Sequence, residues 1–318
     1  MEGLFAWGHS KRYNDYPTYI KSVFGGRVQK ISVNVGFSCP NRDGTKGVGG
    51  CIYCNNKTFK PGYCETDIPV KDQIAKGVAF FEKKYPDMRY MAYFQSYTNT
   101  YAPVNKLRKL YLEAIAHPKV IGLVIGTRPD CINADILNML KNIAADIPVT
   151  IEFGLESTND KTLNEINRCH TWSDSINAIE QCNLYGIDVG AHLILGLPNE
   201  TRKQMLEHAH IISELPIKTL KLHQLQVIKN TQLAKRYNQN PDYVNLFSFQ
   251  EYLDFVIGFI EVLNPKIIIE RFVSTSPINE LIAPHWNSMK NFEIVAKIEK
   301  ELARQNTYQG RLYKANKN

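Results

Sequence analysis

The sequence predicts an α/β fold, an incomplete (β/α)6 TIM-type barrel with a C-terminal α/β extension. Short strand-like runs alternate with amphipathic helical segments about six times between residues 27 and 237. Strands that alternate with helices pair in parallel through right-handed crossovers. Six such units fall short of the eight of a closed barrel. We therefore expect a sheet that is open along one side and leaves a lateral cleft for a large substrate.

The strands are predicted from alternating or continuous apolar runs. Ile31, Val33 and Val35 alternate with polar residues up to Gly36, which is the period of a half-buried strand. Five further runs, most of them closed by glycine or polar residues, predict the other strands of the barrel at 90–97, 120–126, 149–154, 189–195 and 220–227.

Helices are predicted between these strands from apolar spacing and from start and stop residues, at 69–84, 104–116, 134–145, 173–185 and 200–214. Asn133 is the expected N-cap of the third helix, and Gly186 ends the fourth. After residue 238 the regular alternation of strands and helices ends, and the sequence predicts a helix, a strand and a final amphipathic helix, at 249–263, 266–270 and 288–304. We divide the chain into an N-terminal segment, the barrel and an extension packed on the same core, at 1–26, 27–237 and 238–318.

The composition is that of an ordinary globular chain. Of 318 residues, 44% are hydrophobic and 22% charged, which excludes disorder as the main state. No apolar run approaches the roughly 20 residues of a membrane span, and the polar start does not resemble a signal peptide, so we expect a cytoplasmic protein. The net charge of +7 favours an anionic partner such as nucleic acid, although dispersed lysines are also typical of a solvated surface.

The most specific motif follows the first strand. GFSCPNRDGTKGVGGCIYCNN places Cys39, Cys51 and Cys54 in one glycine-rich loop, which can wrap closely around a compact group. Three thiolates on a four-iron cluster leave one iron open, whereas ordinary electron carriers use four. Two alternatives stay open, a zinc site completed by Cys64 and plain buried cysteines. The motif lies at the carboxyl end of a barrel strand, where barrel enzymes carry their chemistry.

This segment resembles the radical S-adenosylmethionine (SAM) superfamily, and in detail its YtqA/YhcC-type family, in its long cysteine spacing and its C-P-N-R-D-G wording. The resemblance spans about residues 13–286. It extends to IEFGLEST, INRCHT, HLILGLP and LKLHQLQVIKNT, which are similar to the elongator-type and coproporphyrinogen-oxidase-type branches. It implies a metal centre, a 4Fe-4S cluster, on Cys39, Cys51 and Cys54, with SAM chelated by the open iron. It also implies reductive SAM cleavage, hydrogen abstraction from substrate, and an external one-electron donor such as flavodoxin or ferredoxin.

Contacts to SAM are implied by the same resemblance. Tyr53 would pack on the adenine, for which a flat aromatic ring is suited. Arg168 matches an arginine that approaches the SAM carboxylate in relatives, and Ser157 matches a serine in the corresponding motif of those relatives. Glu152 and Glu156 lie in an otherwise apolar strand, where buried carboxylates need partners. Ribose hydroxyls or the methionine amine of SAM would provide them.

The chain departs from the family pattern at two places. FQSYTNT stands where most relatives carry Gly-Gly-Glu to hold the SAM amino group, and Gln95, Ser96 and Thr98 are the candidates to replace it. Cys169 stands where many relatives have glycine, which predicts either a less strained backbone or a role for its thiol.

No residue is assigned an acid–base role. His192 and His223 lie in predicted strands, where a histidine is more often a core residue than a catalyst. A thiol near the radical would quench it or act as a hydrogen donor, so four further cysteines matter if they line the cavity: Cys64, Cys131, Cys169 and Cys182.

The resemblance and the positive charge indicate tRNA as the substrate. The implied reaction removes the carboxymethyl part of carboxymethylaminomethyluridine at the wobble position and leaves aminomethyluridine. An extruded base needs aromatic and cationic side chains around the cleft, for which segments 97–101 and 271–290 are the candidates. Two alternatives are a radical SAM enzyme that acts on a small molecule or protein side chain, and a zinc-bound adaptor without catalytic activity.

Overall fold

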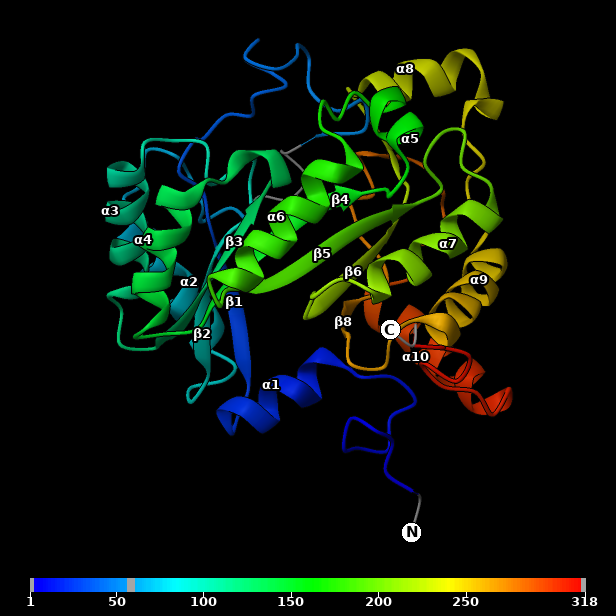
Figure 1. Cartoon of the computed structure of the whole chain (residues 1–318), viewed down its shortest axis with the longest axis horizontal. Helices are drawn as coiled ribbons and strands as arrows, with labels where there is room; N and C mark the ends of the chain where they lie inside the picture. The colour runs from blue at the N-terminus through cyan, green and yellow to red at the C-terminus, as the bar shows by residue number, and fades with distance from the viewer. Residues whose placement is uncertain (1–2, 56–60, 316–318) are drawn as a thin grey trace.

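A computed structural model describes residues 3–55 and 61–315. Within these residues, seven strands form one curved parallel sheet in the order β1-β2-β3-β4-β5-β6-β8 (Figure 1). The strands are β1 Val28–Val33, β2 Arg89–Phe94, β3 Val120–Thr127, β4 Val149–Glu156, β5 Asp188–Leu195, β6 Thr219–Gln224 and β8 Ile268–Arg271. The predicted incomplete α/β barrel is confirmed. The strand predicted in the extension pairs with β6 and becomes the seventh strand of the sheet.

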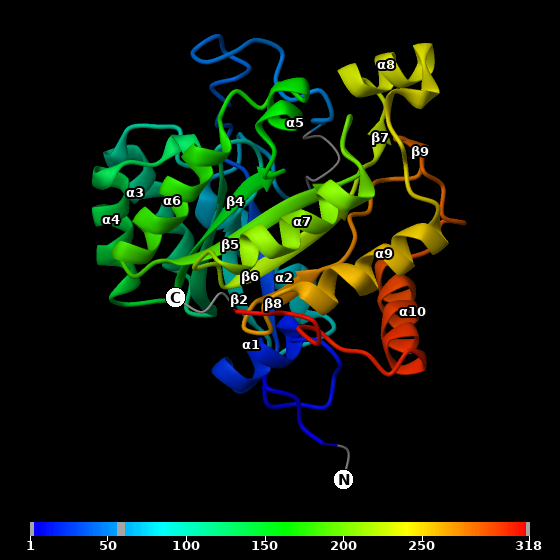
Figure 2. The same ribbon diagram turned by 45° about the vertical axis from the view of Figure 1, so that its right-hand side comes forward.

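Helices cover the outer face of the sheet (Figures 1 and 2). Those that follow barrel strands are α2 Val70–Glu82, α3 Val104–Ile115, α4 Ala134–Ala144, α6 Trp172–Leu184 and α7 Arg202–Ser213, and those of the C-terminal region are α9 Phe249–Val262 and α10 Asn291–Arg304. Asn133 caps α4 by accepting from the Ile136 amide, as predicted. Gly186, with φ of +71°, follows the end of α6. These local signals place the helices close to their predicted bounds.

The two faces of the sheet differ in chemistry. Apolar residues such as Ile31 and Val33 pack outward against the helices in the main core. The opposite face lines the barrel interior and carries polar residues at its carboxyl end. At its amino end the interior is filled by Met91, Tyr93 and Val124. Both faces of the sheet are therefore covered, although only the outer one is uniformly apolar.

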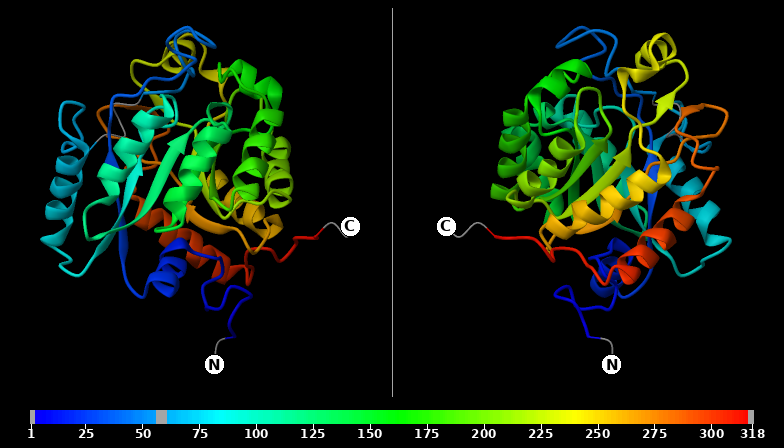
Figure 3. Two further views of the ribbon diagram at one scale, coloured as in Figure 1. Left: turned by 60° about the vertical axis from the view of Figure 1, so that its left-hand side comes forward. Right: turned by 90° about the vertical axis from the view of Figure 1, so that its right-hand side faces the viewer.

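A helix absent from the predictions closes the bottom of the barrel. This helix, α1 Tyr16–Phe24, begins at Asp15, whose side chain accepts from the Thr18 amide. It packs Ile20 into the apolar cluster at the amino ends of the strands. In the side views of Figure 3 it lies opposite the loop that carries Cys39, Cys51 and Cys54, called the cysteine loop below. The Asp-x-Pro start at residues 15–17 is the sequence signal that predicts such an N-terminus.

The carboxyl end of the sheet carries the connecting elements. The short helices α5 Asp160–Glu165 and α8 Gln232–Gln239 lie beside the cysteine loop (Figure 2), and the loop's Ile52 carbonyl accepts from the Leu233 amide at 2.8 Å. The remaining elements are a two-stranded sheet of β7 Val227–Ile228 and β9 Leu281–Ala283, and 3-10 turns η2 Pro129–Cys131 and η3 Pro241–Tyr243. The division into three segments remains a prediction.

None of the helices in the described part of the chain combines the length and the apolar character that a membrane crossing requires.

Candidate functional site

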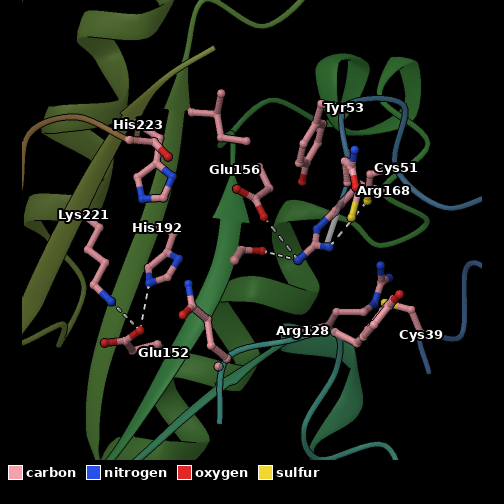
Figure 4. Close-up of a pocket in the computed structure, with 18 of the residues that line it drawn as sticks. Cys39, Cys51, Tyr53, Arg128, Glu152, Glu156, Arg168, His192, Lys221 and His223 are labelled. Atoms are coloured by element: carbon pink, nitrogen blue, oxygen red, sulfur yellow. Dashed lines mark hydrogen bonds and ion pairs between the residues drawn. The ribbon is translucent and has the colours of Figure 1, made fainter. Parts of the chain in front are cut away.

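A cavity of about 210 Å³ opens at the carboxyl end of the strands (Figure 4). Its wall brings together nine of the eleven residues predicted for the site: Cys39, Cys51, Tyr53, Cys54, Gln95, Thr98, Glu152, Glu156 and Arg168. These residues come from the cysteine loop, from the segment after β2, from β4 and from the segment after α5. Residues that are far apart in the sequence therefore face one space.

The two remaining predicted residues, Ser96 and Ser157, are not among the described residues that line the cavity. Ser157 instead donates to the carboxylate of Glu200 and accepts from the Asn159 amide. Ser96 is buried. The local sequence did not reveal where the side chains of Ser96 and Ser157 point, because their orientation depends on how β2 and β4 end.

Donors surround the sulfur of Cys51. Its Sγ lies 3.3 Å from Nδ2 of Asn41 and 3.6 Å from Nη1 of Arg168. Sγ of Cys39 lies 2.8 Å from the Thr98 hydroxyl. Cations and N–H donors stabilise a thiolate. The surroundings of these sulfurs thus suit thiolates that ligate metal.

Burial opposes that charge while the sulfurs are unligated. Burial, and then the neighbouring Cys51 and Cys39, raise the pKa of the Cys54 thiol to about 12. Burial also raises the pKa of Cys39, against the hydrogen bond from Thr98. Metal binding must therefore displace protons from these thiols.

The zinc alternative needs Cys64 as a ligand in addition to the cysteines of the loop. Within the described residues, no three His, Cys, Asp or Glu side chains are grouped closely enough to hold a single metal ion. Cys64 is buried outside the cavity lining, and its Sγ donates to the Ser32 carbonyl at 2.8 Å. A larger cluster does not require its sulfur ligands to meet at one point.

Arg168 and Glu156 form the polar wall next to the cysteines. Nη2 of Arg168 donates to the Gly154 carbonyl at 2.6 Å and lies 3.6 Å from Oε1 of Glu156. The register of β4 against β5 shifts between Gly154 and Glu156, and Glu156 has φ of +67°. Such an irregularity redirects a side chain at the end of a strand. It directs the Glu156 carboxylate toward Arg168 and the cavity (Figure 4).

Arg128 is a second buried arginine of the site and is absent from the predicted residues. Its Nε and Nη2 bind both oxygens of Asp130, at 2.9 and 3.0 Å. Burial opposes the charge of Asp130, but Arg128 and then Lys46 lower its pKa to about 2. Nζ of Lys46 reaches Asp130 at 2.6 Å, so the ion pairs fasten the cysteine loop to the end of β3. The signal in the sequence is T-R-P-D directly after a barrel strand.

The floor of the cavity is a network of buried charges. Oε1 of Glu152 accepts from Lys30 at 2.6 Å, and Oε2 accepts from Lys221 at 2.6 Å and from Tyr93 at 2.7 Å. His192 Nε2 lies 3.1 Å from the same Oε2 (Figure 4). Four protein groups thus already satisfy the Glu152 carboxylate. We therefore do not assign Glu152 to SAM.

Glu270 completes the network. Nζ of Lys30 lies 2.6 Å from its Oε1 and that of Lys221 lies 3.2 Å away. Burial opposes the charge on Glu152, yet Lys221 and Lys30 hold its pKa well below the usual range. Two lysines and two glutamates therefore balance in charge inside the barrel.

The additional thiols do not line this space. Cys64, Cys131, Cys169 and Cys182 are not among the described residues that line the cavity. Cys169 keeps the left-handed backbone that glycine favours, with φ of +57°, so the expectation of a less strained backbone there is wrong. Its Sγ packs against Gly47, where a Cβ would come within 2.7 Å. The thiol therefore helps to hold the cysteine loop.

Comparison with known proteins agrees with this architecture. The family model of the radical SAM superfamily matches residues 33–212, and that of the Radical_SAM C-terminal domain matches residues 217–304. The chain is 32% identical over 306 residues to YtqA of Bacillus subtilis, which covers 95% of this chain and 93% of YtqA.

Two further similarities are more distant. A tRNA uridine(34) acetyltransferase of Methanocaldococcus infernus is 28% identical over 168 residues, which is 51% of this chain and 29% of that protein. The structure of M. infernus Elp3 with an N-terminal deletion superposes with a TM-score of 0.68 at 14% identity, over 89% of this chain and 64% of that one. At this identity the superposition shows the fold alone.

Proposed function

The chain belongs to the radical SAM superfamily, and we propose that Cys39, Cys51 and Cys54 hold the 4Fe-4S cluster that members of this family bind together with SAM. When bound, these groups supply one-electron cleavage of SAM and hydrogen abstraction from a substrate. The observation that carries the proposal is that all three cysteines line one cavity with Arg168 at the carboxyl end of the sheet. Asn41 and Arg168 would hold the charge of Cys51 as its proton leaves.

The neighbouring side chains suit SAM. Arg168 has an unpartnered Nε, buried among the described residues, and a guanidinium can bind a carboxylate with two donors. Glu156 accepts from an amine or from hydroxyls. Tyr53 offers a ring face to an adenine, and Gln95 is the cavity-lining candidate from the segment after β2 that can replace Gly-Gly-Glu. Thr98 is assigned to Cys39 instead, because its hydroxyl already contacts that sulfur.

A direct assay tests this function. Protein reconstituted anaerobically with iron and sulfide is given SAM and a strong reductant, with and without bulk tRNA, and 5′-deoxyadenosine is measured. Formation of 5′-deoxyadenosine that tRNA stimulates is the expected result. No product from a protein with an intact cluster would contradict the radical function.

We propose tRNA as the substrate class, and wobble-uridine side-chain modification as the reaction. The partial similarity to a protein named for its action on tRNA uridine 34 supports this class, and a net charge of +7 suits a polyanion. The specific reaction converts carboxymethylaminomethyluridine to aminomethyluridine. Hydrogen abstraction from the carboxymethyl carbon next to the side-chain nitrogen, with loss of one further electron to the electron-transfer partner and of a proton, would give an imine. Water would hydrolyse this imine, releasing the carboxymethyl part as glyoxylate and leaving the amine. The electron donor would be a flavodoxin or ferredoxin.

The substrate has its own test, separate from radical formation. Nucleosides of tRNA from a strain that lacks the protein are compared with wild type by mass spectrometry. We expect carboxymethylaminomethyluridine to accumulate and aminomethyluridine to decrease. An unchanged profile would reject this substrate, and 5′-deoxyadenosine formation that ignores tRNA would favour a small molecule or a protein side chain.

A further inference from the structure

One wall of the cavity carries polar groups that the network on its floor does not use. Arg271, at the end of β8, and His223, on β6, line the cavity. Neither side chain has a hydrogen bond or an ion pair with another residue in segments 3–55 and 61–315. The remaining polar side chains nearby are bound: Gln224 donates to the Ser274 carbonyl at 2.8 Å, and Ser276 donates to Gln226 at 2.8 Å.

The charge of Arg271 is not compensated by the network. Lys30 and Lys221 balance Glu152 and Glu270, as described above. Register pairs Arg271 with Lys221 on the neighbouring strand, so the guanidinium joins a region whose two carboxylates are already bound. One positive charge is therefore left to face the cavity, where an anion would be favoured.

His223 is oriented by its neighbour. Its ring stacks on that of His192, with centroids 5.6 Å apart and an angle of 29° between the planes, and it lies toward the side of the cavity opposite Arg168 (Figure 4). His192 is held in turn by Glu152. Burial, then His192 and Arg271, keep the pKa of His223 well below its ordinary value. The ring is thus neutral near pH 7 and has one N–H to donate.

We propose that Arg271 and His223 bind an anionic group of the substrate, and that this group is the carboxylate of its side chain. The inference rests on the proposed function, and it extends that function by assigning substrate specificity to two residues. A guanidinium with two N–H groups and an imidazole with one match the two oxygens of a carboxylate. Because Arg168 and the cysteines lie on the other side of the cavity, SAM and the substrate carboxylate would approach the reacting carbon from opposite walls.

A backbone phosphate of an RNA substrate has similar chemistry, and a binding experiment separates the two. Two synthetic anticodon stem-loop RNAs are used, one with carboxymethylaminomethyluridine at the wobble position and one with aminomethyluridine, which lacks the carboxylate. Affinities are measured for reconstituted wild-type protein, Arg271→Gln, Arg271→Lys and His223→Gln. Lys266→Gln removes a charge from an exposed residue near the other end of β8 and serves as the control.

We expect Arg271→Gln to weaken binding of the carboxylate RNA about 10- to 100-fold, the effect of losing a charge-assisted hydrogen bond, and to leave the other RNA unchanged. Arg271→Lys should lose less, because it keeps the charge but not the paired donors. Equal weakening of both RNAs would place a phosphate there and overturn the carboxylate assignment. Unchanged affinity for both RNAs would overturn the site altogether.

Two further readouts keep this inference separate from the proposed function. SAM affinity should stay at the wild-type value in Arg271→Gln, and its loss would assign Arg271 to the SAM site instead. If wild type discriminates between the RNAs and Arg271→Gln does so equally, the inference fails while the function stands. If the tRNA profile of the deletion strain is unchanged, the substrate proposal fails by its own test.

Discussion

Nζ of Lys221 lies 2.6 Å from Oε2 of Glu152 inside the barrel, where the two side chains are 3% and 1% exposed. Burial lowers the pKa of Lys221, while Lys221 and Lys30 hold the pKa of Glu152 well below its usual range against the effect of burial. Separating two buried charges from water is costly unless each has a partner. The glutamate is therefore essential to the charge balance of the fold.

Glu152→Gln tests that balance with little change of shape. The variant leaves Lys30 and Lys221 to share Glu270, and removal of one partner of a buried pair costs about 3–5 kcal/mol. The free energy of unfolding of the metal-free protein, measured by urea denaturation, should fall by that amount. Glu299→Gln is the control, because Glu299 pairs with Lys11 at the surface and such pairs contribute about 0–1 kcal/mol. Equal stability of the two variants would contradict the prediction.

Acid should destabilise the fold through its buried histidines. Burial, and then Arg168 and Arg128, lower the pKa of His170 to about 3. The unfolded chain takes up a proton on this residue below pH 6.5, whereas the folded chain does not until about pH 3. Stability therefore falls as the pH drops between these values, by at most about 1.4 kcal/mol per pH unit for one proton.

His170→Asn isolates this contribution. Unfolding free energies of the metal-free protein between pH 7 and pH 5 should show a shallower pH dependence in the variant, even if its stability at pH 7 is lower. His210→Asn is the matched control at an exposed position. A slope identical to that of wild type would mean that His170 is protonated in the folded protein.

The proposed metal ligands can be distinguished from the other thiols. Replacing Cys39, Cys51 or Cys54 individually by alanine should abolish 5′-deoxyadenosine formation and strongly reduce iron and sulfide content after reconstitution. Cys64→Ser should retain both, because the hydroxyl can replace the hydrogen bond to the Ser32 carbonyl. Iron content and the visible absorption spectrum are the measurements. Loss of the cluster in Cys64→Ser alone would reverse the assignment.

Gly154 supplies a test of the polar wall. A Cβ at this position would lie 2.5 Å from Oε1 of Glu156 and 2.8 Å from Nη2 of Arg168, so Gly154→Ala must displace both side chains. We expect SAM affinity to fall about 10- to 100-fold, as for a lost charge-assisted hydrogen bond. Equilibrium binding of SAM to reconstituted protein measures it.

Gly258→Ala is the control for this variant. Nothing lies within 4 Å of a Cβ at that position in α9, and the change should stabilise the helix by about 1 kcal/mol without affecting SAM. Wild-type SAM affinity in Gly154→Ala would remove Glu156 and Arg168 from the proposed site.

Local patterns in the sequence predict most of the fold. The strands and the helices around them follow from apolar spacing, and the cap at Asn133 and the stop at Gly186 are visible without any tertiary information. The cysteine loop is equally local. α1 is not among the predicted helices because it is short, and its main contribution is to fill the bottom of a barrel whose curvature no local pattern encodes.

The interior charges show why the rest could not be predicted. Lys30 precedes Ile31 in a run of alternating polar and apolar residues. The polar residues of such a run are typical of the strand face that is exposed to water. In the structure that face lines the barrel, and Lys30 meets Glu152 and Glu270, which lie 122 and 240 residues further along the chain. The position of Ser157 outside the cavity lining could not be predicted for a related reason. The irregular end of β4 turns its hydroxyl toward Glu200.

The pair of Lys30 and Glu270 joins the first and last strands of the sheet, β1 and β8, which end its hydrogen-bonded order in the described structure. In a closed barrel the backbone ladder fixes the strand spacing at about 4.8 Å, so the circumference changes only by whole strands. Here two side chains span the gap. Closure of this barrel therefore depends on side-chain charge at the point where a closed barrel would depend on the backbone.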